Sequence, residues 1–203
     1  IIVEVQYLLN TINDLTFDNI YHEHYNYWSL TSLEYFFKKF NVNIFKAEKI
    51  DTHGGSLRIY ISKDKKKKKD KSFNIILNQE KKFGIKKFET FSNYANKVEN
   101  IKVNVQKNII NLKNKFDQII GYGAPAKATT SLNYYGITNE IDFIIENNQL
   151  KQGKYLPGTN IPIYSKKKLI NKSSLIIVLA WNFFEDIKKN NSELPNKIIS
   201  FKH

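Results

Sequence analysis

The chain has 203 residues, of which 41% are hydrophobic and 14% aromatic, enough for the core of one large domain or two small ones. It contains no cysteine, which excludes a disulfide framework and a thiolate metal site. No apolar run approaches the ~18 residues of a membrane helix and no secretory signal opens the chain, so we expect a cytoplasmic protein without a membrane partner.

The net charge of +13 comes almost entirely from lysine, because Arg58 is the only arginine among the 32 basic residues. Lysine, asparagine and isoleucine share A/T-rich codons, so a bias in genome base composition is the simplest cause. A nucleic-acid binder usually places arginine forks and aromatic platforms on its basic face. The densest lysine run, residues 65–69, contains no aromatic residue. We expect a solvated loop there and no nucleic-acid partner.

The first 62 residues alternate between strand and helix patterns. Residues 1–9 are a near-continuous apolar run, which predicts a buried parallel strand. Ser29 or Thr31 can cap a helix that runs to about residue 40. Residues 42–50 and 56–62 then have the pattern of two strands joined by a turn. This order is typical of the end of a nucleotide-type α/β sheet whose last strand is antiparallel.

The rest of the chain predicts connecting helices and a second α/β region. A charged break covers residues 63–72, and apolar residues then recur at helical spacing over residues 73–116, which predicts one or two helices. The later elements are expected as strands ending at residue 121 and covering residues 141–145, 175–180 and 197–201, and as helices over residues 126–134 and 182–189. Such alternation predicts a parallel sheet with helices on its faces.

Residues 21–28, YHEHYNYW, concentrate side chains that handle protons. The ordinary pKa of histidine lies near neutrality, so His22 or His24 can act as a base or an acid. Glu23 can orient an imidazole and stabilise its cation, and Tyr21 can donate to a developing oxyanion. The alternative is an aromatic-rich strand end whose histidines have structural partners. The octet by itself leaves both interpretations open.

A glycine-rich turn follows the strand that ends at residue 121. Gly121, Gly123 and Ala126 have the spacing of a dinucleotide-binding turn, in which the glycines let the backbone approach a ligand. Glu146 lies ~20 residues downstream, where such folds place an acid for the ribose. Lys127 would favour an anion. The alternative is an ordinary strand-to-helix turn of an α/β domain.

The turn at residues 52–55 is a second candidate. His53 precedes two glycines, and Arg58 follows them in a strand, where drift toward lysine would be expected. A retained arginine suggests a need for a planar, bidentate donor, although a structural ion pair explains it equally well. His22, His24 and His53 do not have the spacing of a metal motif, so we expect no metal site.

Residues 151–158 form a glycine- and proline-rich loop after the expected strand at residues 141–145. Ligands of open α/β sheets bind beyond the carboxyl ends of the strands. Lys154 and Tyr155 are therefore candidate ligands, and the alternative is an ordinary turn.

Taken together, these motifs resemble those of the sugar-nucleotide C-methyltransferases, which use S-adenosylmethionine on keto-deoxysugars. The matching stretches are FDNIYHEHYNYWSL (residues 17–30), THGGSLRIYI (52–61), GYGAPAKATTSLNYYGI (121–137), KQGKYLPGTNIPI (151–163) and LAWNF (179–183). They follow the family order over nearly the whole chain. One departure is Glu146, where the family tends to carry aspartate.

The resemblance implies a domain organisation. The family has a small zinc-binding module, then a methyltransferase domain, then a C-terminal α/β domain. By resemblance, residues 1–72 are the end of a class I methyltransferase-like sheet, residues 73–115 are connecting helices, and residues 116–203 are a Rossmann-like domain with a parallel sheet. The sequence would then be a fragment, with the zinc module and the S-adenosylmethionine loop outside it.

The resemblance also implies roles. His24 would remove a proton from the carbon beside the ketone, and the resulting enolate would attack the methyl group of S-adenosylmethionine. Tyr21 and Glu23 would orient or stabilise, and His22 is a weaker candidate for the base. The nucleotide sugar would be bound by His53, Arg58, Gly121, Gly123, Lys127, Glu146, Lys154 and Tyr155. The alternative function is a non-catalytic module that binds a sugar nucleotide or a dinucleotide.

Overall fold

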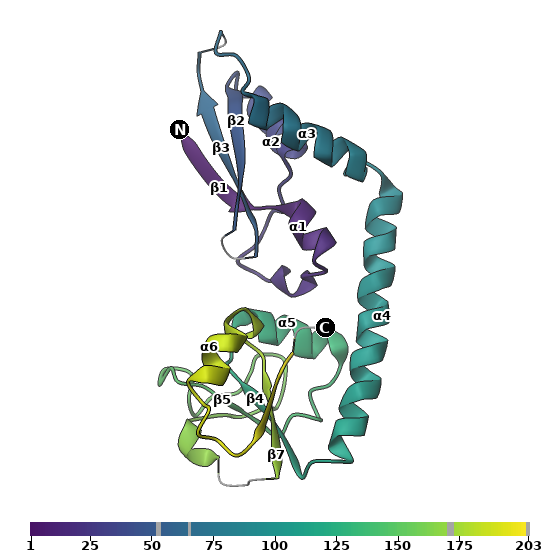
Figure 1. Ribbon diagram of the computed structural model, residues 1–203, viewed down its shortest axis with the longest axis vertical. Coiled ribbons are helices and arrows are strands. Elements are labelled where there is room, and N and C mark those ends of the chain that lie inside the picture. The colour runs from purple at the N-terminus through teal and green to yellow at the C-terminus, as the bar shows by residue number, and fades with distance from the viewer. Residues whose placement is uncertain (52–53, 65, 170–172, 202–203) are drawn as a thin grey trace. The chain divides into compact units, whose positions relative to one another are not determined.

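The computed structural model describes residues 1–51, 54–64, 66–169 and 173–201, which group into two units (Figure 1). The first unit comprises Ile1–Phe17 and His22–Val98, and the second comprises Asp18–Tyr21 and Glu99–His203. The four residues Asp18–Tyr21 thus belong to the second unit, although the residues on both sides of them belong to the first. The last of these four residues, Tyr21, is also the first residue of the octet.

The first unit contains a three-stranded sheet in the order β1-β3-β2. The strands are β1 (Ile2–Gln6), β2 (Asn43–Ile50) and β3 (Ser56–Ser62), and β3 is antiparallel to both neighbours. The antiparallel pair predicted at residues 42–50 and 56–62 is therefore confirmed.

The prediction of a strand over residues 1–9 is only partly right. The strand ends at Gln6, and α1 (Leu8–Asn13) begins two residues later. Between the two elements, Tyr7 forms a parallel β-bridge with Trp28, and the amide of Leu8 donates to the carbonyl of Trp28 at 2.9 Å. Within the described sheet, β1 pairs with β3 alone and has partly exposed residues, unlike the buried parallel strand that the apolar run predicted.

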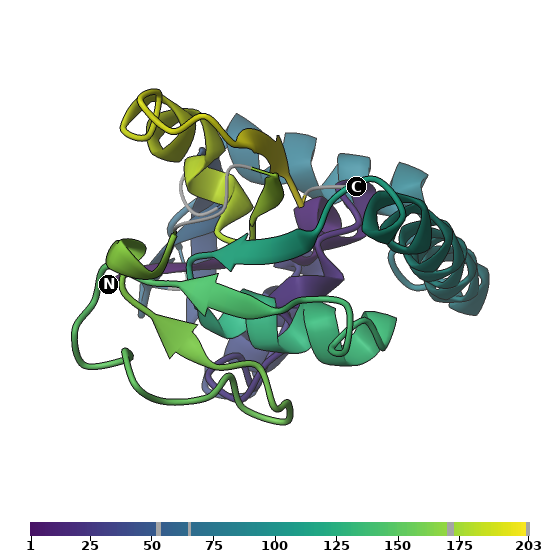
Figure 2. The same ribbon diagram turned by 90° about the horizontal axis from the view of Figure 1, so that it is seen from below.

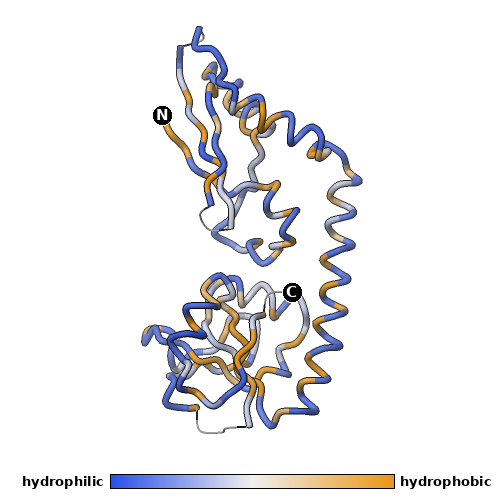
Figure 3. Tube along the Cα trace, viewed as in Figure 1, coloured by the Kyte–Doolittle hydropathy of each residue, from blue (hydrophilic) through white to orange (hydrophobic). Residues whose placement is uncertain are grey.

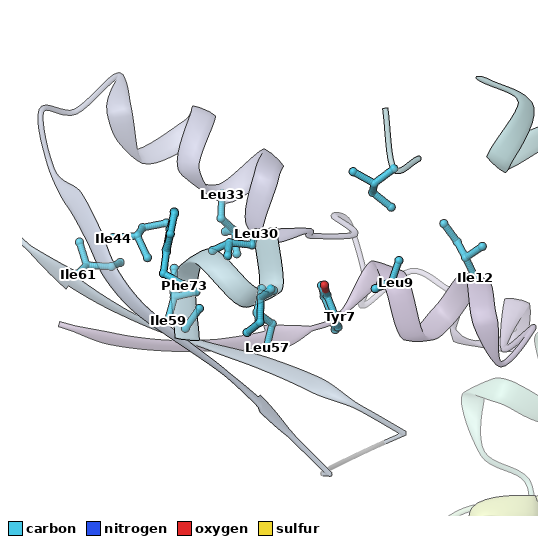
Figure 4. Packing of buried hydrophobic residues seen from close by; sticks show 13 residues of the cluster. Tyr7, Leu9, Ile12, Leu30, Leu33, Ile44, Leu57, Ile59, Ile61 and Phe73 are labelled. Carbon is cyan, nitrogen blue, oxygen red and sulfur yellow. The ribbon is translucent and has the colours of Figure 1, made fainter. Parts of the chain in front are cut away.

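Two helices, α2 (Leu30–Lys38) and α3 (Lys71–Phe83), pack against β2 of the first unit. Ser29 caps α2 as predicted, because its hydroxyl accepts from the amide of Ser32. Figure 4 shows the core that these elements enclose. Its largest fully buried side chains include those of Tyr7, Leu30, Leu57, Ile59 and Phe73.

The helical spacing over residues 73–116 produces two helices. The first, α3, ends at Gly84, whose φ of +80° places it in the left-handed region that favours glycine. The second, α4 (Phe88–Lys113), has 26 residues. Apolar and polar residues alternate along α4 (Figure 3), and Val98 and Ile109 are its buried positions.

The second unit has a five-stranded sheet in the order β6-β5-β4-β7-β8, with every neighbouring pair parallel (Figure 2). The strands are β4 (Gln118–Tyr122), β5 (Phe143–Ile145), β6 (Ile163–Tyr164), β7 (Ser174–Val178) and β8 (Lys197–Ser200), and the helices are α5 (Ala126–Tyr135) and α6 (Phe184–Lys189). Every residue of β7 is buried, as expected of a central parallel strand. The predicted Rossmann-like α/β domain is confirmed.

Three short 3-10 helices complete the fold: η1 (Phe17–Asn19), η2 (Lys166–Lys168) and η3 (Trp181–Phe183). Because the strands of the second sheet are parallel, the segments that follow β4, β5 and β7 begin at one edge of the sheet.

In the described part of the chain, no helix has the length and hydrophobicity to span a bilayer.

Candidate active site

The octet of residues 21–28, here called the octet loop, is an irregular segment between η1 and α2. His22 and Glu23 are exposed, with side chains 82% and 68% accessible, and the His22 Nε2 atom lies 4.0 Å from Glu23 Oε1. Tyr21 and His24 are half-buried. The loop therefore presents carboxylate and imidazole groups where a small molecule can reach them.

The end of the octet loop is fixed by the carboxylate of Glu80, which is fully buried on α3. Glu80 Oε1 accepts from the amide of Leu30 at 2.6 Å, and Oε2 accepts from the amide and the hydroxyl of Thr31 at 2.8 and 2.6 Å. Tyr7 donates its hydroxyl hydrogen to Oε1 at 2.9 Å. A carboxylate in this place pairs the free amides at the start of α2 and meets the positive end of the helix dipole.

Lys127 is the second residue of α5 and is half-buried. Its Nζ atom lies 4.7 Å from the centre of the Trp181 ring. Burial lowers the pKa of the Lys127 ammonium, and the charge of Asp18 opposes this shift. Trp181 in turn donates its indole N–H to Asp18 Oδ2 at 2.6 Å. The cation predicted to bind substrate thus already contacts an aromatic face and lies near a carboxylate.

The glycines of the turn after β4 face protein atoms. A Cβ atom on Gly121 would lie 2.7 Å from Leu179 Cδ1 and 2.9 Å from Ile144 Cγ1. Gly123 has a φ of +86°, and a Cβ atom there would lie 3.0 Å from the Cβ of Ala180. The close approach that these glycines permit is therefore an approach of side chains from β5 and from the segment after β7.

Glu146 follows β5 and binds the same turn. Its Oε2 atom accepts from the amide of Ala124 at 2.9 Å, and its Oε1 atom accepts from the amide of Asn148 at 3.0 Å. Lys151 Nζ lies 3.9 Å from Oε2 and donates to the carbonyl of Ala124 at 2.8 Å. The structure thus brings Gly123 and Glu146 together, and the carboxylate holds the turn.

Lys154 and Tyr155 are exposed residues of the loop between β5 and β6. The carbonyl of Lys154 accepts from the amide of Ile163 at 2.8 Å, and Tyr155 forms a β-bridge with Pro162. The backbone of this loop is therefore fixed against β6, while the two side chains remain accessible.

Arg58 lies on β3 directly opposite Glu4 on β1. Its Nε and Nη2 atoms donate to Glu4 Oε2 at 3.0 and 2.8 Å, which is the ion pair that the sequence left open as an alternative to substrate binding. The hydrogen bond to Glu4 raises the pKa of Arg58. His53, the other candidate of this turn, lies outside the described residues. Substrate binding by Arg58 and His53 stays a prediction.

Sequence reasoning missed Asp18, Glu80 and Trp181. Asp18 and Trp181 lie inside the stretches of residues 17–30 and 179–183 that carried the family resemblance, which is a signal that could have singled them out. Glu80 had no such signal, because it is one acid in a helix whose neighbours are lysines. Its role depends on contacts with residues 49 to 73 positions away.

In the described ranges, no group of three or more histidine, aspartate or glutamate side chains has a geometry that could hold a metal ion.

The four residues of the octet that were predicted to act in catalysis adjoin one another in sequence. Lys127 and Glu146 both follow strands of the second sheet at its carboxyl edge.

Comparisons with known proteins identify the family. The sequence profile of the C-methyltransferase C-terminal domain matches residues 51–201. The C-methyltransferase NovU of Streptomyces niveus is 30% identical over 194 residues, which cover 94% of this chain and 46% of the relative. The chain thus spans about half the length of the curated relative that it matches. Since the family profile covers most of the sequence, this chain belongs to the C-methyltransferase family.

Proposed function

We propose that this chain is part of an enzyme that methylates a carbon of a nucleotide-linked keto-deoxysugar, with S-adenosylmethionine as the methyl donor. Membership of the C-methyltransferase family supports the class of reaction. The observation that carries the proposal is the octet loop, which offers two imidazoles and a carboxylate to a small molecule and leads into a helix fixed by buried Glu80.

The chemistry needs a base because a carbon beside a ketone becomes nucleophilic only after it loses a proton. In the proposal, His24 takes that proton, and the electron pair of the C–H bond moves into the enolate. Tyr21 donates a hydrogen bond to the enolate oxygen, and Glu23 stabilises the imidazolium that forms. His22 is a weaker candidate for the base, since its side chain is the more exposed of the two.

The described residues do not fit S-adenosylmethionine. The glycine-rich turn after β4 is filled by Leu179, Ile144 and Ala180, and Glu146 is engaged by backbone amides. In the first unit, the described sheet has only three strands, in the order β1-β3-β2. We therefore assign the donor, and the zinc module of the family, to the part of the relative's length that this chain does not match.

The second unit would bind the nucleotide sugar through the predicted ligands at the carboxyl edge of its sheet. Lys127, Lys154 and Tyr155 have accessible or half-buried side chains there or in the adjoining loop. In this proposal, residues 1–72 are the C-terminal part of a methyltransferase domain, residues 73–115 are helices that connect this part to the next domain, and residues 116–203 bind the substrate. We also propose that the enzyme works in the cytoplasm and without nucleic acid.

The test is the replacement of His24 by glutamine in the enzyme that contains this chain. Removal of the base should lower the rate of methyl transfer to a keto-deoxysugar nucleotide by roughly 10²–10⁴-fold. A second readout is the exchange of the acceptor proton with solvent deuterium, which should slow by a similar factor. His22→Gln is the matched control, because it changes the neighbouring imidazole, and it should retain most of the exchange rate.

Near-normal methylation and proton exchange in a folded His24→Gln variant would overturn the assignment of the base. Calorimetric titration separates the proposal from the alternative of a dinucleotide-binding module. We expect the 203-residue chain to bind the nucleotide sugar and not S-adenosylmethionine or NAD. Micromolar affinity for NAD alone would favour a dinucleotide-binding module.

A further inference from the structure

Asp18 lies in the segment Asp18–Tyr21, which belongs to the second unit and whose last residue is the first residue of the octet loop. Asp18 is part of η1, three positions before Tyr21, and is only 2% exposed. Its Oδ2 atom accepts a 2.6 Å hydrogen bond from the indole N–H of Trp181, which is 163 positions away in the sequence. Trp181 opens η3, just beyond the carboxyl end of β7.

The hydrogen bond from Trp181 compensates for the burial of the Asp18 carboxylate. Its other carboxylate oxygen, Oδ1, is buried and has no hydrogen-bond partner among the described residues. A buried carboxylate is costly unless hydrogen bonds and opposite charge compensate it, and loss of one partner leaves a desolvated charge. The indole N–H provides the hydrogen bond, and the Lys127 ammonium, which lies over the Trp181 ring, provides positive charge nearby.

A second contact holds the same segment. Thr130, on α5, donates its hydroxyl hydrogen to the carbonyl of Ile20 at 3.3 Å. Asn19 is also buried, whereas Ile20 and the next exposed residues, His22 and Glu23, face solvent. The path of the backbone is thus fixed up to Tyr21, and the exposed part of the octet loop starts from that fixed point.

We propose that Asp18 and Trp181 are positioning residues for the octet loop. This inference rests on the proposed function, because it assumes that His24 and Tyr21 act on the substrate. A catalytic group must be held close to its productive position, and a displacement of about 1 Å can cost 10²-fold in rate. Glu80 binds the amides of Leu30 and Thr31, beyond the other end of the loop, whereas the Asp18–Trp181 hydrogen bond lies within the second unit, just before the start of the loop.

The first test is hydrogen exchange on the 203-residue chain. Trp181→Phe keeps an aromatic ring beside Lys127 and removes the indole N–H. Loss of the hydrogen bond to a charged group should accelerate amide exchange of residues 19–24 by about tenfold or more. The strands β4 and β7 should keep their protection, which shows that the unit remains folded. Phe183→Leu, a change of an exposed residue in the same 3-10 helix, is the matched control and should alter neither.

The second test uses the enzyme that contains this chain. Trp181→Phe should lower kcat by about tenfold or more while the KM for the nucleotide sugar changes little, because binding groups stay in place. Asp18→Ala should act alike, and the double variant should be no slower than the slower single variant, as expected when two residues act through one hydrogen bond.

The outcomes separate this inference from the proposed function. Unchanged exchange of residues 19–24 in Trp181→Phe, or additive losses of kcat in the double variant, would overturn the positioning role even if His24→Gln is inactive. Accelerated exchange with normal turnover of His24→Gln would support the attachment of the loop and refute the proposed base.

Discussion

Tyr7 donates its hydroxyl hydrogen to Glu80 across 2.9 Å in the core of the first unit, where both side chains are fully buried. The same carboxylate accepts hydrogen bonds from the amides of Leu30 and Thr31 and from the hydroxyl of Thr31. A buried charge is tolerated when its lone pairs are occupied in this way. Glu80 on α3 therefore binds the first amides of α2, next to the Ser29 cap, and Tyr7 occupies a further lone pair of the same carboxylate.

Replacement of Tyr7 by phenylalanine should destabilise the first unit by about 1–3 kcal/mol, because Glu80 loses a donor that buried water cannot readily replace. The measurement is the free energy of unfolding in urea. Tyr134→Phe is the control, since its hydroxyl bonds Glu99 at 2.8 Å near the surface, where water can take its place. Equal losses in the free energy of unfolding of Tyr7→Phe and Tyr134→Phe would show that burial does not make the Tyr7–Glu80 hydrogen bond more stabilising than an exposed one.

Stability should also depend on alkaline pH through Tyr7. Burial, first, and the charge and hydrogen bond of Glu80 raise the pKa of Tyr7 above its ordinary value of 10.0. The folded state thus holds the phenol proton more tightly than the unfolded chain. The stabilisation is complete below about pH 10 and declines as the pH rises above it, by up to about 1.4 kcal/mol per pH unit.

The comparison between wild type and Tyr7→Phe isolates this effect, because the other titrating groups are common to both. The stability difference should stay constant from about pH 7 to 9.5 and shrink at higher pH. Burial also raises the pKa of Tyr134, to about 12, but this residue is present in both proteins. A difference that stays constant up to about pH 11 would contradict the assigned cause.

Strands whose sequences have a regular alternating or continuous apolar pattern were predicted well. The alternation before and after the turn at residues 52–55 predicted β2 and β3, and the apolar run at residues 175–180 predicted β7. In contrast, the near-continuous apolar run of residues 1–9 predicted a single strand, whereas β1 ends at Gln6 and α1 begins at Leu8. The strand β6 has two residues, which is too short for a pattern.

The octet was singled out from the sequence and its catalytic role stays a prediction, whereas the contacts that hold the residues before and after it were not predicted. The octet was evident because its residue types are unusual side by side. Asp18 and Glu80 were not, because a buried carboxylate is recognised by its partners, and those of Asp18 and Glu80 are distant in sequence. The glycine-rich turn was found, although the atoms that approach Gly121 belong to Leu179 and Ile144.

Gly121→Ala tests whether that turn serves packing or a ligand. The added Cβ would lie 2.7 Å from Leu179 Cδ1, in the middle of a close-packed sheet, and should destabilise the second unit by about 1–3 kcal/mol. Leu179→Ala should cost less in the Gly121→Ala background than in wild type, because the smaller side chain relieves the clash. The measurement is thermal or urea unfolding of the four proteins. Undiminished stability with weakened nucleotide-sugar binding would instead assign the glycine to a ligand.

The last prediction concerns the relative stability of the two sheets. In the second unit, β4 and β7 each have a strand on both sides, and four of the five residues of β4 and all five of β7 are buried. In the first unit, β3 alone has two neighbours within the described sheet, and β1 is only partly buried. Because strand amides exchange slowly when they are paired and covered, the first sheet should open more readily than the second.

Hydrogen exchange of the 203-residue chain measures this directly. The comparison of the two central strands, β3 and β7, removes the effect of being at an edge, and the comparison of the two edge strands, β1 and β8, repeats the test where protection is weak. We expect faster exchange in β3 than in β7 and in β1 than in β8. Equal or greater protection over residues 1–62 would contradict the prediction and would show that the three-stranded sheet, with α2 and α3 packed on β2, is stable without a further neighbouring strand.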